Sequence, residues 1–388
     1  MKKALVLLAL FLLLCGCSSQ QTVSNSIPDP AVTSAETQVC TTCDTIPQTT
    51  PEDETEPAAT DTTTPASDPS DETVPLTGSA DPVSNIDETV TGIHYHNNLS
   101  AYYSGNVLVC GDYALEYFSM SKSGCADWAA AVNAFAARFP AVHVSALLVP
   151  KCCAFHAPAG FDNQYDNQAA YISATYAQLQ DGITAVDAAS LLAEHSGEYL
   201  YYRTDHHWTS LGAYYASAAY CRAVGITPRQ LSSYETTVQT GYVGSLYSFC
   251  TEPPACLKTN PDYTVCHLPL AEYEMTYDNG SGFLDGLALN TETNAYASAF
   301  LGGDNALTKI TTNNQTGRRL LIFKESYGNA FVPYMIDYYD EIIVVDIRED
   351  TDSVASIIAN YGITDALVIN NVQASESLPA DLAAKLAS

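Results

Sequence analysis

The sequence predicts an α/β fold in which helices cover both faces of a mainly parallel sheet, preceded by a disordered N-terminal tether. Two observations support this architecture. Apolar runs of strand length alternate with helical patterns from about residue 93 onward, and residues 18–92 consist largely of Thr, Ser, Pro, Asp and Glu. The 388 residues are 47% hydrophobic, which is enough for a core of domain size. We therefore expect one folded domain over 93–388.

The charge balance narrows the classes of function. Forty-four acidic residues against fifteen basic ones give a net charge of −29. Such a chain repels a phosphate backbone, which excludes nucleic-acid binding, and it lacks the basic patch needed to grip anionic lipid. A single apolar run near the N-terminus approaches membrane length, so multi-pass transporters and channels are excluded as well.

The first residues predict export and a lipid anchor. Two lysines precede an apolar run over 4–14, which is short for a transmembrane helix and is typical of a secretory signal. Leu14, Gly16 and Cys17 follow in a pattern over 1–17 that resembles a bacterial lipoprotein signal. On this interpretation Cys17 carries the lipid and holds the protein on the extracytoplasmic face of the cell membrane. The alternative is an ordinary signal peptide cleaved nearby.

The next segment, 18–92, predicts a disordered tether. No Lys or Arg occurs between Lys3 and Lys122, and the Pro/Thr-rich acidic composition can bury too little apolar surface to fold. Self-repulsion keeps such a chain extended, which would hold the domain away from the membrane. Cys40 and Cys43 form a CxxC pair without the strand and helix of a redox motif, so we expect a local disulfide or two free thiols.

The folded domain alternates strands and helices. Expected strands cover 106–110, 142–149, 183–187, 320–323, 342–346 and 366–370. Expected helices cover 127–139, 166–180, 188–195, 209–224, 327–339, 353–361 and the residues after Pro379. Repeated strand–helix–strand units favour a parallel sheet with helices on both faces. Residues 226–317 break this rhythm with alternating apolar positions, so we expect a β-rich insertion beside the main sheet.

Chemistry in a parallel sheet is expected at the carboxyl ends of its strands. No G-x-G-x-x-G opens a helix after the first strand, and no P-loop motif is present in the sequence. Dinucleotide and nucleoside triphosphate chemistry therefore have no support, and we expect no organic cofactor.

Eight cysteines follow the tether. A disulfide is permitted outside the cell, and the loop-rich stretch with Cys250, Cys256 and Cys266 is the best place for one. Two combinations of Cys and His are conceivable metal sites: Cys152, Cys153 and His156, or Cys256, Cys266 and His267. Neither has the paired CxxC spacing of structural zinc, so we expect no metal.

Asp205, His206 and His207 form a dense group of titratable side chains. In an extended backbone, residues two apart share a face, so Asp205 and His207 are expected to meet while His206 points away. A carboxylate on one imidazole nitrogen fixes the tautomer that a general base needs. Two alternatives stay open: adjacent histidines beside an Asp as metal ligands, or a polar turn before a helix.

Ser326 lies where an apolar strand ends and a helix begins. A serine there is often an N-cap, but the position also suits a nucleophile whose oxyanion is held by free amides of the helix start. Gly328 would let a substrate approach the backbone closely. With the Asp205–His207 pair and Asn370 at a later strand end, Ser326 completes a set of nucleophile, base, orienter and oxyanion donor.

These residues carry a resemblance to a known family. Thr-Asp-His-His-Trp-Thr at 204–209, followed by Leu-Gly-Ala-Tyr-Tyr at 211–215, resembles the signature of the bacterial DHHW-motif protein family. That family is related to the alginate O-acetyltransferase proteins with an SGNH hydrolase-like domain. The resemblance extends through 147–151, 321–327, 338–342 and 345–348. It therefore covers nearly all of the chain after the tether.

The resemblance implies an SGNH hydrolase-like fold and serine-dependent acyl transfer. Carried over by position, Ser326 is the nucleophile, His207 the base and Asp205 its orienter. Candidates for oxyanion or substrate contacts are Tyr327, Arg348, Asn370 and Asn371. Glu325 departs from the pattern, because relatives usually show Asp before the serine.

We expect a surface-anchored acyl esterase or O-acetyltransferase that acts on a cell-envelope or extracellular polysaccharide. Its partners would be the membrane, through the lipid on Cys17, the acylated glycan and, for a transferase, a membrane protein that supplies the acyl group. Tyrosines such as Tyr201, Tyr202 and Tyr214 could stack on sugar rings or pack in the core. The main alternative is a non-catalytic envelope lipoprotein that binds glycan or a surface protein. A metal phosphoesterase is weaker, because its other aspartate motifs are absent.

Overall fold

The computed structural model describes residues 100–158, 160–161, 167–278, 281–349 and 353–388. The lipid anchor expected at Cys17 and the tether expected over 18–92 lie outside these residues. Within the described part of the chain, no helix combines the length and the apolar character needed to cross a bilayer.

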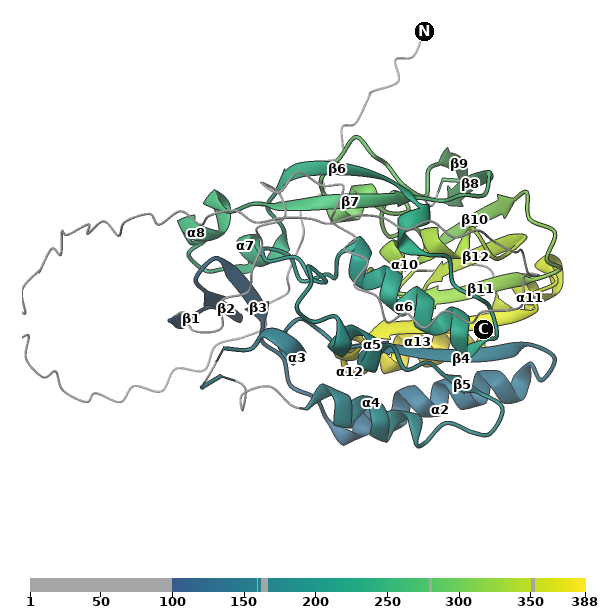
Figure 1. Cartoon of the computed structure of the whole chain (residues 1–388). Coiled ribbons are helices and arrows are strands. Elements are labelled where there is room, and N and C mark those ends of the chain that lie inside the picture. The colour runs from purple at the N-terminus through teal and green to yellow at the C-terminus, as the bar shows by residue number, and fades with distance from the viewer. Residues whose placement is uncertain (1–99, 159, 162–166, 279–280, 350–352) are drawn as a thin grey trace, which may run out of the picture. The chain divides into compact units, whose positions relative to one another are not determined.

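An eight-stranded sheet with the order β5-β4-β13-β11-β12-β10-β8-β9 forms the centre of the described domain (Figure 1). The first five of these strands run parallel to one another: β5 (Thr184–Ala185), β4 (His143–Val149), β13 (Asp365–Asn371), β11 (Arg319–Lys324) and β12 (Glu341–Asp346). This mainly parallel sheet confirms the predicted α/β fold.

The central parallel strands are buried on both faces, because their side chains alternate between two apolar clusters. In β11, Leu320 and Ile322 face one cluster, whereas Leu321 and Phe323 face the other. Helices α5 (Ala188–Glu194), α6 (Ser210–Ala223) and α10 (Gly328–Met335) contribute to the first cluster. Helices α2 (Lys122–Arg138), α4 (Gln168–Tyr176), α11 (Val354–Tyr361) and α13 (Pro379–Ala387) contribute to the second.

Local sequence signals fix the ends of these helices. The Thr209 hydroxyl accepts a hydrogen bond from the amide of Gly212 at 3.3 Å, and so caps the start of α6 as expected. Gly362 adopts a φ of 59° directly after α11, a conformation that ends a helix and favours glycine. Helix α12 (Val372–Ser377), which begins immediately after β13, was not anticipated from the sequence.

The segment 226–317 is rich in β-structure, but much of it belongs to the main sheet. Strands β10 (Leu307–Thr312), β8 (Tyr273–Asp278) and β9 (Phe283–Gly286) extend that sheet beyond β12 through antiparallel pairing. The remainder forms a separate hairpin of β6 (Glu235–Tyr242) and β7 (Asp262–Leu268), with the short helices α7 (Ser245–Phe249), α8 (Ala255–Thr259) and α9 (Tyr296–Ala299). Alternating apolar positions predict strands, but they do not show which sheet a strand joins.

The first expected strand lies in a small antiparallel sheet of its own. Strands β1 (Ala101–Ser104), β2 (Val107–Cys110) and β3 (Tyr113–Glu116) follow one another in a meander. One face of this sheet packs against Leu246 of α7 and Leu257 of α8. The other face joins the main core through Leu108 and Leu115.

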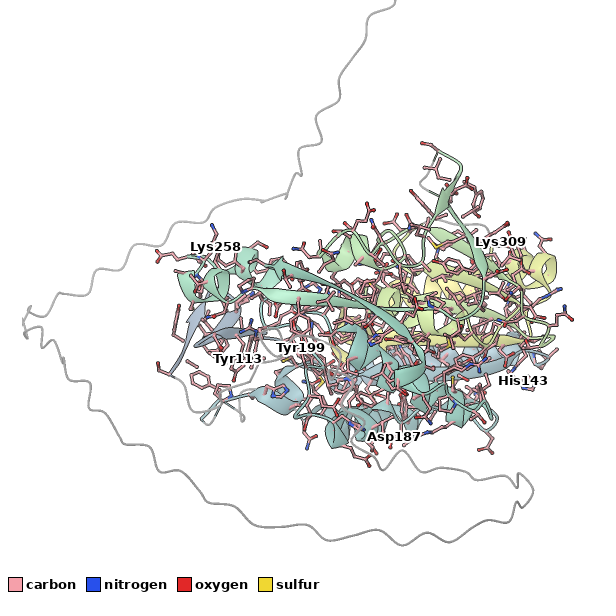
Figure 2. The ribbon with its side chains drawn as sticks, turned by 45° about the horizontal axis from the view of Figure 1, so that its top comes forward. Tyr113, His143, Asp187, Tyr199, Lys258 and Lys309 are labelled. Atoms are coloured by element: carbon pink, nitrogen blue, oxygen red, sulfur yellow. The ribbon has the colours of Figure 1, made fainter. Side chains whose placement is uncertain are left out.

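The carboxyl ends of the parallel strands lie at the end of the main sheet that is nearer the small sheet. In Figure 2, His143 at the start of β4 lies at the opposite end of the domain from Tyr113, and Tyr199 lies between them. The amide of Ala114 in β3 donates to the carbonyl of Arg203 at 2.8 Å, which joins the small sheet to the residues that precede α6. These residues include the Asp205–His207 motif.

The described cysteines, all of which follow the tether, are free thiols. The disulfide expected among Cys250, Cys256 and Cys266 is therefore absent. The three do not share one loop, because Cys266 lies buried inside β7, whereas Cys250 follows α7 and Cys256 belongs to α8.

We expect the folded protein to lose stability in mild acid, because two of its histidines are buried. Burial lowers the pKa of both His156 and His267 to about 4, whereas the unfolded chain takes up these protons near pH 6.5. Because acid then favours the unfolded state, the free energy of unfolding should fall as pH drops from about 6.5 to 4, by up to about 3 kcal/mol per histidine. Urea unfolding at several pH values measures this slope. A His267→Gln variant should show a shallower slope, and a flat profile in the parent protein would contradict the expectation.

Candidate active site

Ser326, His207 and Asp205 form one hydrogen-bonded chain. The hydroxyl of Ser326 lies 2.8 Å from Nε2 of His207, and Nδ1 of the same ring lies 2.6 Å from Oδ1 of Asp205. His207 and Asp205 are buried, whereas Ser326 is partly exposed. The structure thus brings together a hydroxyl and an imidazole that are 119 positions apart in the sequence.

A tight loop, rather than the extended strand expected from the sequence, places Asp205 against His207. Tyr201 and Trp208 form an isolated antiparallel bridge, and the amide of Tyr202 donates to the carbonyl of His207 at 3.2 Å. Within this loop, Oδ1 of Asp205 also accepts the backbone amide of His207 at 3.0 Å. The side chain of Asp205 therefore fixes both the backbone and the ring of His207.

His206 does not point away from the site. Its ring centroid lies 3.8 Å from that of His207, and its Nδ1 lies 2.5 Å from the hydroxyl of Ser245. Burial, reinforced by the neighbouring His207, lowers the pKa of His206 to about 2, so that this imidazole is neutral at pH 7. The expectation of opposite faces failed because the residues between Tyr201 and Trp208 are not in a strand.

Both carboxylate oxygens of Asp205 are fully engaged. Oδ1 accepts from His207, and Oδ2 accepts from the hydroxyl of Tyr242 at 2.7 Å and the amide of Ser245 at 2.8 Å. Burial alone would raise the pKa of this carboxyl group, but the charge and hydrogen bonds of His207 hold it well below its usual value. Asp205 is therefore an ionised acceptor at neutral pH.

The same engagement argues against a metal site here. Ligand atoms of Asp205, His206 and His207 lie within 4.8 Å of one another. A cation would have to displace the amide and hydroxyl groups that donate to Asp205. In addition, Nδ1 of His206 is already bonded to Ser245, and Nδ1 of His207 is bonded to Asp205. This donor set suits an oriented general base better than a metal cage.

Asp262, at the start of β7, anchors the loop from outside. Its carboxylate accepts the amides of Arg203 at 3.0 Å and Thr204 at 2.8 Å, the hydroxyl of Thr204 at 2.6 Å and the hydroxyl of Tyr199 at 2.7 Å. Sequence reasoning missed this residue, because it lies nearly sixty positions away and no motif marks it.

Tyr296 links His207 to the backbone of Ser326. Its buried ring stacks on His207 with centroids 3.9 Å apart and an interplanar angle of 12°. Its hydroxyl donates to the carbonyl of Ser326 at 2.9 Å. On the other side, Nε1 of Trp208 donates to the carbonyl of Tyr327 at 2.9 Å. The hydroxyl of Tyr327 also donates to the carbonyl of His206 at 2.5 Å, so several contacts besides the Ser326–His207 bond hold the Asp205 loop and the Ser326 turn together.

The amides at the start of α10 are occupied, contrary to the expected free oxyanion donors. The amide of Tyr327 donates to Oε2 of Glu325 at 3.1 Å. The amide of Gly328 donates to the carbonyl of Glu325 at 2.9 Å, and that of Asn329 to the carbonyl of Ser326 at 3.1 Å. Ser326 therefore sits in a tight turn in which these three amides are engaged, and an oxyanion donor has to come from another group or from a rearrangement of Glu325.

Glu325 ties the serine turn to the neighbouring strand. Besides the Tyr327 amide, its buried carboxylate accepts the amide of Asn371 at 2.9 Å and lies 3.3 Å from the Ser326 hydroxyl. The extra methylene of Glu relative to Asp lets this side chain span from the end of β11 to the end of β13.

Replacement of Glu325 by Gln should impair the site. One carboxylate oxygen becomes an NH₂ group, which would face the amide of Tyr327 or of Asn371 and leave a buried donor unpaired. We expect a loss of roughly 1–3 kcal/mol in the free energy of unfolding. Chemical denaturation measures the loss. The matched variant Glu292→Gln, at an exposed position, should leave stability unchanged, and equal stability of both variants would refute this role of Glu325.

The four candidate oxyanion or substrate residues divide into two kinds. Tyr327 is fully buried, and Asn371 accepts the Ala374 amide at 3.0 Å and caps α12, so both hold structure. Asn370 differs from them. Its Oδ1 accepts from Trp128 at 3.0 Å, while its buried Nδ2 has no hydrogen-bond partner. Asn370 thus retains a free donor at the carboxyl end of β13, next to β11.

Arg348 is held by carboxylates. Its guanidinium contacts Asp346 at 2.6 Å and Asp304 at 2.8 Å, and Lys324 contacts the same two acids at 2.7 and 3.1 Å. Hydrogen bonding to Asp346 raises the pKa of Arg348. The structure therefore places Arg348 in an ion-pair network at the carboxyl ends of β11 and β12, with its charge already balanced.

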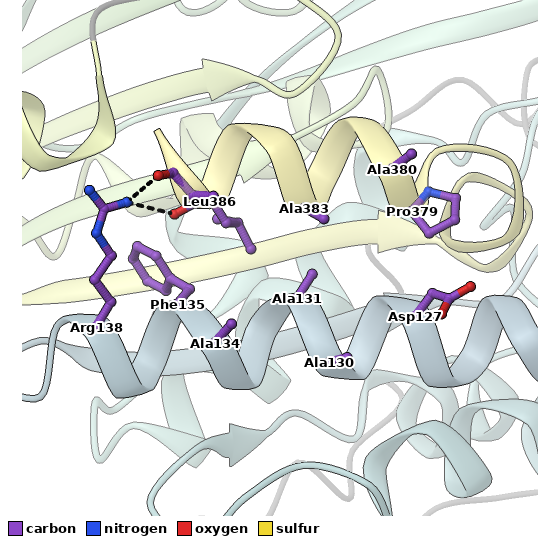
Figure 3. Close-up of a pocket in the computed structure, with 11 residues that line it drawn as sticks. Asp127, Ala130, Ala131, Ala134, Phe135, Arg138, Pro379, Ala380, Ala383 and Leu386 are labelled. Carbon is purple, nitrogen blue, oxygen red and sulfur yellow. Dashed lines mark hydrogen bonds between the residues drawn. The ribbon is translucent and has the colours of Figure 1, made fainter.

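Two larger hollows lie away from Ser326. A groove of about 650 Å³ runs between α2 and α13, and Figure 3 shows its alanine-rich walls and the carbonyls of the α13 terminus that Arg138 binds at one end. A second hollow, of about 950 Å³, lies at the carboxyl ends of β4 and β5 and is lined by residues such as Gln168 and Tyr176. Neither hollow is lined by Ser326, His207 or Asp205.

Some solved structures resemble this chain in both sequence and fold, and others mainly in fold. Among solved structures, a DHHW family protein from Eubacterium siraeum is 31% identical, covers 74% of this chain and 97% of its own, and has a TM-score of 0.68. Two structures of Bacillus cereus PatB1, one with a sulfonyl adduct, are 16% identical with TM-scores of 0.59 and cover 71% and 70% of this chain and 98% and 95% of their own. The O-acetyltransferase domain of Pseudomonas putida AlgJ is 13% identical with a TM-score of 0.41, over 70% of this chain and 96% of its own.

The PatB1 likeness supports the fold alone, whereas the family follows from the stronger matches. No curated protein matches the chain. The family model described as DHHW protein matches residues 72–345, which is more than half of the sequence, and includes the Asp205–His207 loop and Ser326. The resemblance noted in the sequence is thereby confirmed, and the chain belongs to the DHHW family.

Proposed function

We propose that this protein is a serine-dependent acyl esterase or O-acetyltransferase that acts on a cell-envelope or extracellular polysaccharide. The observation that carries the proposal is the chain of two short contacts, from Ser326 to His207 at 2.8 Å and from His207 to Asp205 at 2.6 Å. An accessible hydroxyl, a buried imidazole and an ionised orienting carboxylate are the parts that nucleophilic acyl transfer requires.

The residues take defined roles in the proposed reaction. Ser326 Oγ attacks the acetyl carbonyl while His207 Nε2 takes its proton, and Asp205 stabilises the imidazolium that forms. His207 then returns the proton to the departing alcohol, which leaves an acetyl group on Ser326. Water or a sugar hydroxyl, deprotonated by His207, attacks this ester and releases acetate or the acetylated sugar.

Asn370 is the best candidate to hold the oxyanion. Its free Nδ2 donor lies at the end of β13, and Glu325 already links that strand end to the serine turn. Release of the Tyr327 amide by Glu325 would supply a second donor. Gly328, in contrast, has no room for a side chain, because a Cβ there would lie 2.4 Å from Cβ of Lys324.

A chromogenic acetyl ester tests the proposal. The purified protein should hydrolyse 4-nitrophenyl acetate, and a sulfonyl fluoride should add one sulfonyl group to Ser326 and stop the reaction. The alternative is a non-catalytic lipoprotein that binds glycan or a surface protein. If the protein neither turns over the ester nor reacts with the sulfonyl fluoride, the catalytic proposal fails and this alternative takes its place.

The sequence also motivates a proposal about location. Cys17 in its signal-like context would carry a lipid that holds the domain on the outer face of the cell membrane, where a transferase could receive its acyl group from a membrane partner. A Cys17→Ala substitution should then move the protein from the membrane fraction to the soluble fraction. Unchanged membrane association of this variant would refute the lipid anchor.

A further inference from the structure

We propose that Phe249, together with Tyr102, forms a stacking subsite for an uncharged pyranose ring of the glycan beside Ser326. The position of this sugar relative to the reacting ester rests on the proposed function. The subsite deepens that function, because it names the side chains that would hold the polysaccharide and the kind of sugar that they would accept.

Phe249 is exposed although it is large and apolar. It is the last residue of α7, and its side chain is 54% exposed. Its neighbours Leu246 and Cys250 are buried and pack against Val107 and Val109 of the small sheet, so the core under α7 is filled without Phe249. The exposed ring is therefore available for contact with a ligand.

Phe249 is close to the nucleophile. Its ring lies nearly parallel to that of His206, at 20° and with centroids 6.0 Å apart. His206 stacks in turn on His207 at 3.8 Å, and His207 contacts Ser326. Two ring contacts therefore separate the exposed face of Phe249 from the imidazole that would act on the substrate.

Helix α7 is fixed to the Asp205 loop, so that Phe249 is held in place before a ligand binds. The amide of Ser245 donates to Asp205 at 2.8 Å, and the amide of Leu246 donates to the carbonyl of Thr204 at 2.9 Å. Because the helix that carries Phe249 starts on the orienting carboxylate, binding would require little reorganisation of this helix.

Tyr102, on β1, is a second exposed aromatic ring. Its side chain is 51% exposed, and it pairs with Val109, so that both lie on the face of the small sheet that packs against α7. The turn after β1 touches the end of α7, since a Cβ on Gly105 would lie 3.6 Å from the carbonyl oxygen of Phe249. Tyr102 is thus a second exposed ring on the small sheet against which α7 packs.

The chemistry of these rings selects the ligand. A pyranose offers C–H groups to an aromatic face while its hydroxyls stay in water, so stacking needs no charged partner. The net charge of −29 works against a polyanionic glycan. The tyrosines that the sequence suggested for stacking are unsuitable, because Tyr201, Tyr202 and Tyr214 are all buried.

A binding experiment tests the subsite without turnover. The full chain carrying Ser326→Ala is titrated with chitohexaose, a neutral hexamer of N-acetylglucosamine, by isothermal titration calorimetry. Adding Phe249→Ala should raise the Kd about tenfold, which is the usual scale for loss of an aromatic anchor. Phe249→Trp should retain the affinity. Phe283→Ala is the matched control, since Phe283 is 53% exposed but belongs to the edge strand β9.

The outcomes separate this inference from the proposed function. Equal affinity with and without Phe249, no binding of chitohexaose by the parent, or equally tight binding of hexagalacturonate would each overturn the subsite. If the ester is hydrolysed through Ser326 while Phe249→Ala binds normally, the function stands and the subsite falls. If binding depends on Phe249 but no ester is hydrolysed, the subsite stands and the catalytic function falls.

Discussion

Replacement of Ser326 by Ala is expected to abolish hydrolysis of an acetyl ester, with a fall in kcat/KM of roughly 10⁴-fold or more. The variant removes the hydroxyl that lies 2.8 Å from Nε2 of His207 and leaves the base with nothing to activate. The fold should persist, because the described contacts of this hydroxyl are confined to His207 and Glu325. Hydrolysis of 4-nitrophenyl acetate measures the loss.

Controls for the Ser326 experiment use both a second serine and a covalent label. Ser232→Ala, at an exposed position, should retain full activity. Mass spectrometry after treatment with a sulfonyl fluoride should find the adduct in the parent protein and in Ser232→Ala, but not in Ser326→Ala. Equal hydrolysis by the parent and by Ser326→Ala would show that the serine mechanism is wrong.

Replacement of Asp205 by Asn should cost nearly as much, roughly 10³–10⁴-fold in kcat/KM. Asp205 accepts from Nδ1 of His207, which leaves Nε2 free to take the proton of Ser326. An Asn amide that presents its NH₂ group to Nδ1 selects the opposite tautomer, in which Nε2 carries a proton and cannot act as a base. The other orientation of the amide would instead oppose the Ser245 amide, which donates to Oδ2.

The Asp205 variant separates tautomer control from general damage. Asp285→Asn, on the exposed edge strand β9, is the matched control and should keep parental activity and stability. Asp205→Asn should remain folded by circular dichroism while it loses turnover. Retention of more than about a tenth of the parental kcat/KM would mean that the carboxylate does not orient the base.

Much of the fold could be predicted because buried parallel strands appear in the sequence as short apolar runs. The run 320–323 lies within β11, and 366–370 lies within β13, because both faces of these strands are covered by helices. The same reasoning predicted that 226–317 is rich in β-structure, but not that three of its five strands, β8, β9 and β10, join the main sheet through antiparallel pairs. That pairing depends on contacts far apart in the chain, which periodicity does not reveal.

In the candidate site, too, residues in local motifs could be predicted from the sequence, whereas residues that act through distant contacts could not. Ser326, His207 and Asp205 stood out because each belongs to a local motif. Tyr296 and Asp262 did not, because a tyrosine in a polar segment and an aspartate at a strand start have no signature until the structure shows what they contact. The Asp205–His207 loop was identified correctly as a pair, but its conformation depends on the bridge that brackets it and on Asp262 of β7.

The part of the chain between α6 and β11 is therefore needed to position the residues of the candidate site. It supplies Tyr242 and Ser245, which both donate hydrogen bonds to Asp205. It also supplies Asp262, which accepts hydrogen bonds from the loop, and Tyr296, which stacks on the ring of His207. A shortened domain without this stretch would keep Ser326, His207 and Asp205 in the sequence. It would lose the contacts that hold these three side chains in position. Swaps of this stretch between relatives should accordingly be made as one intact block.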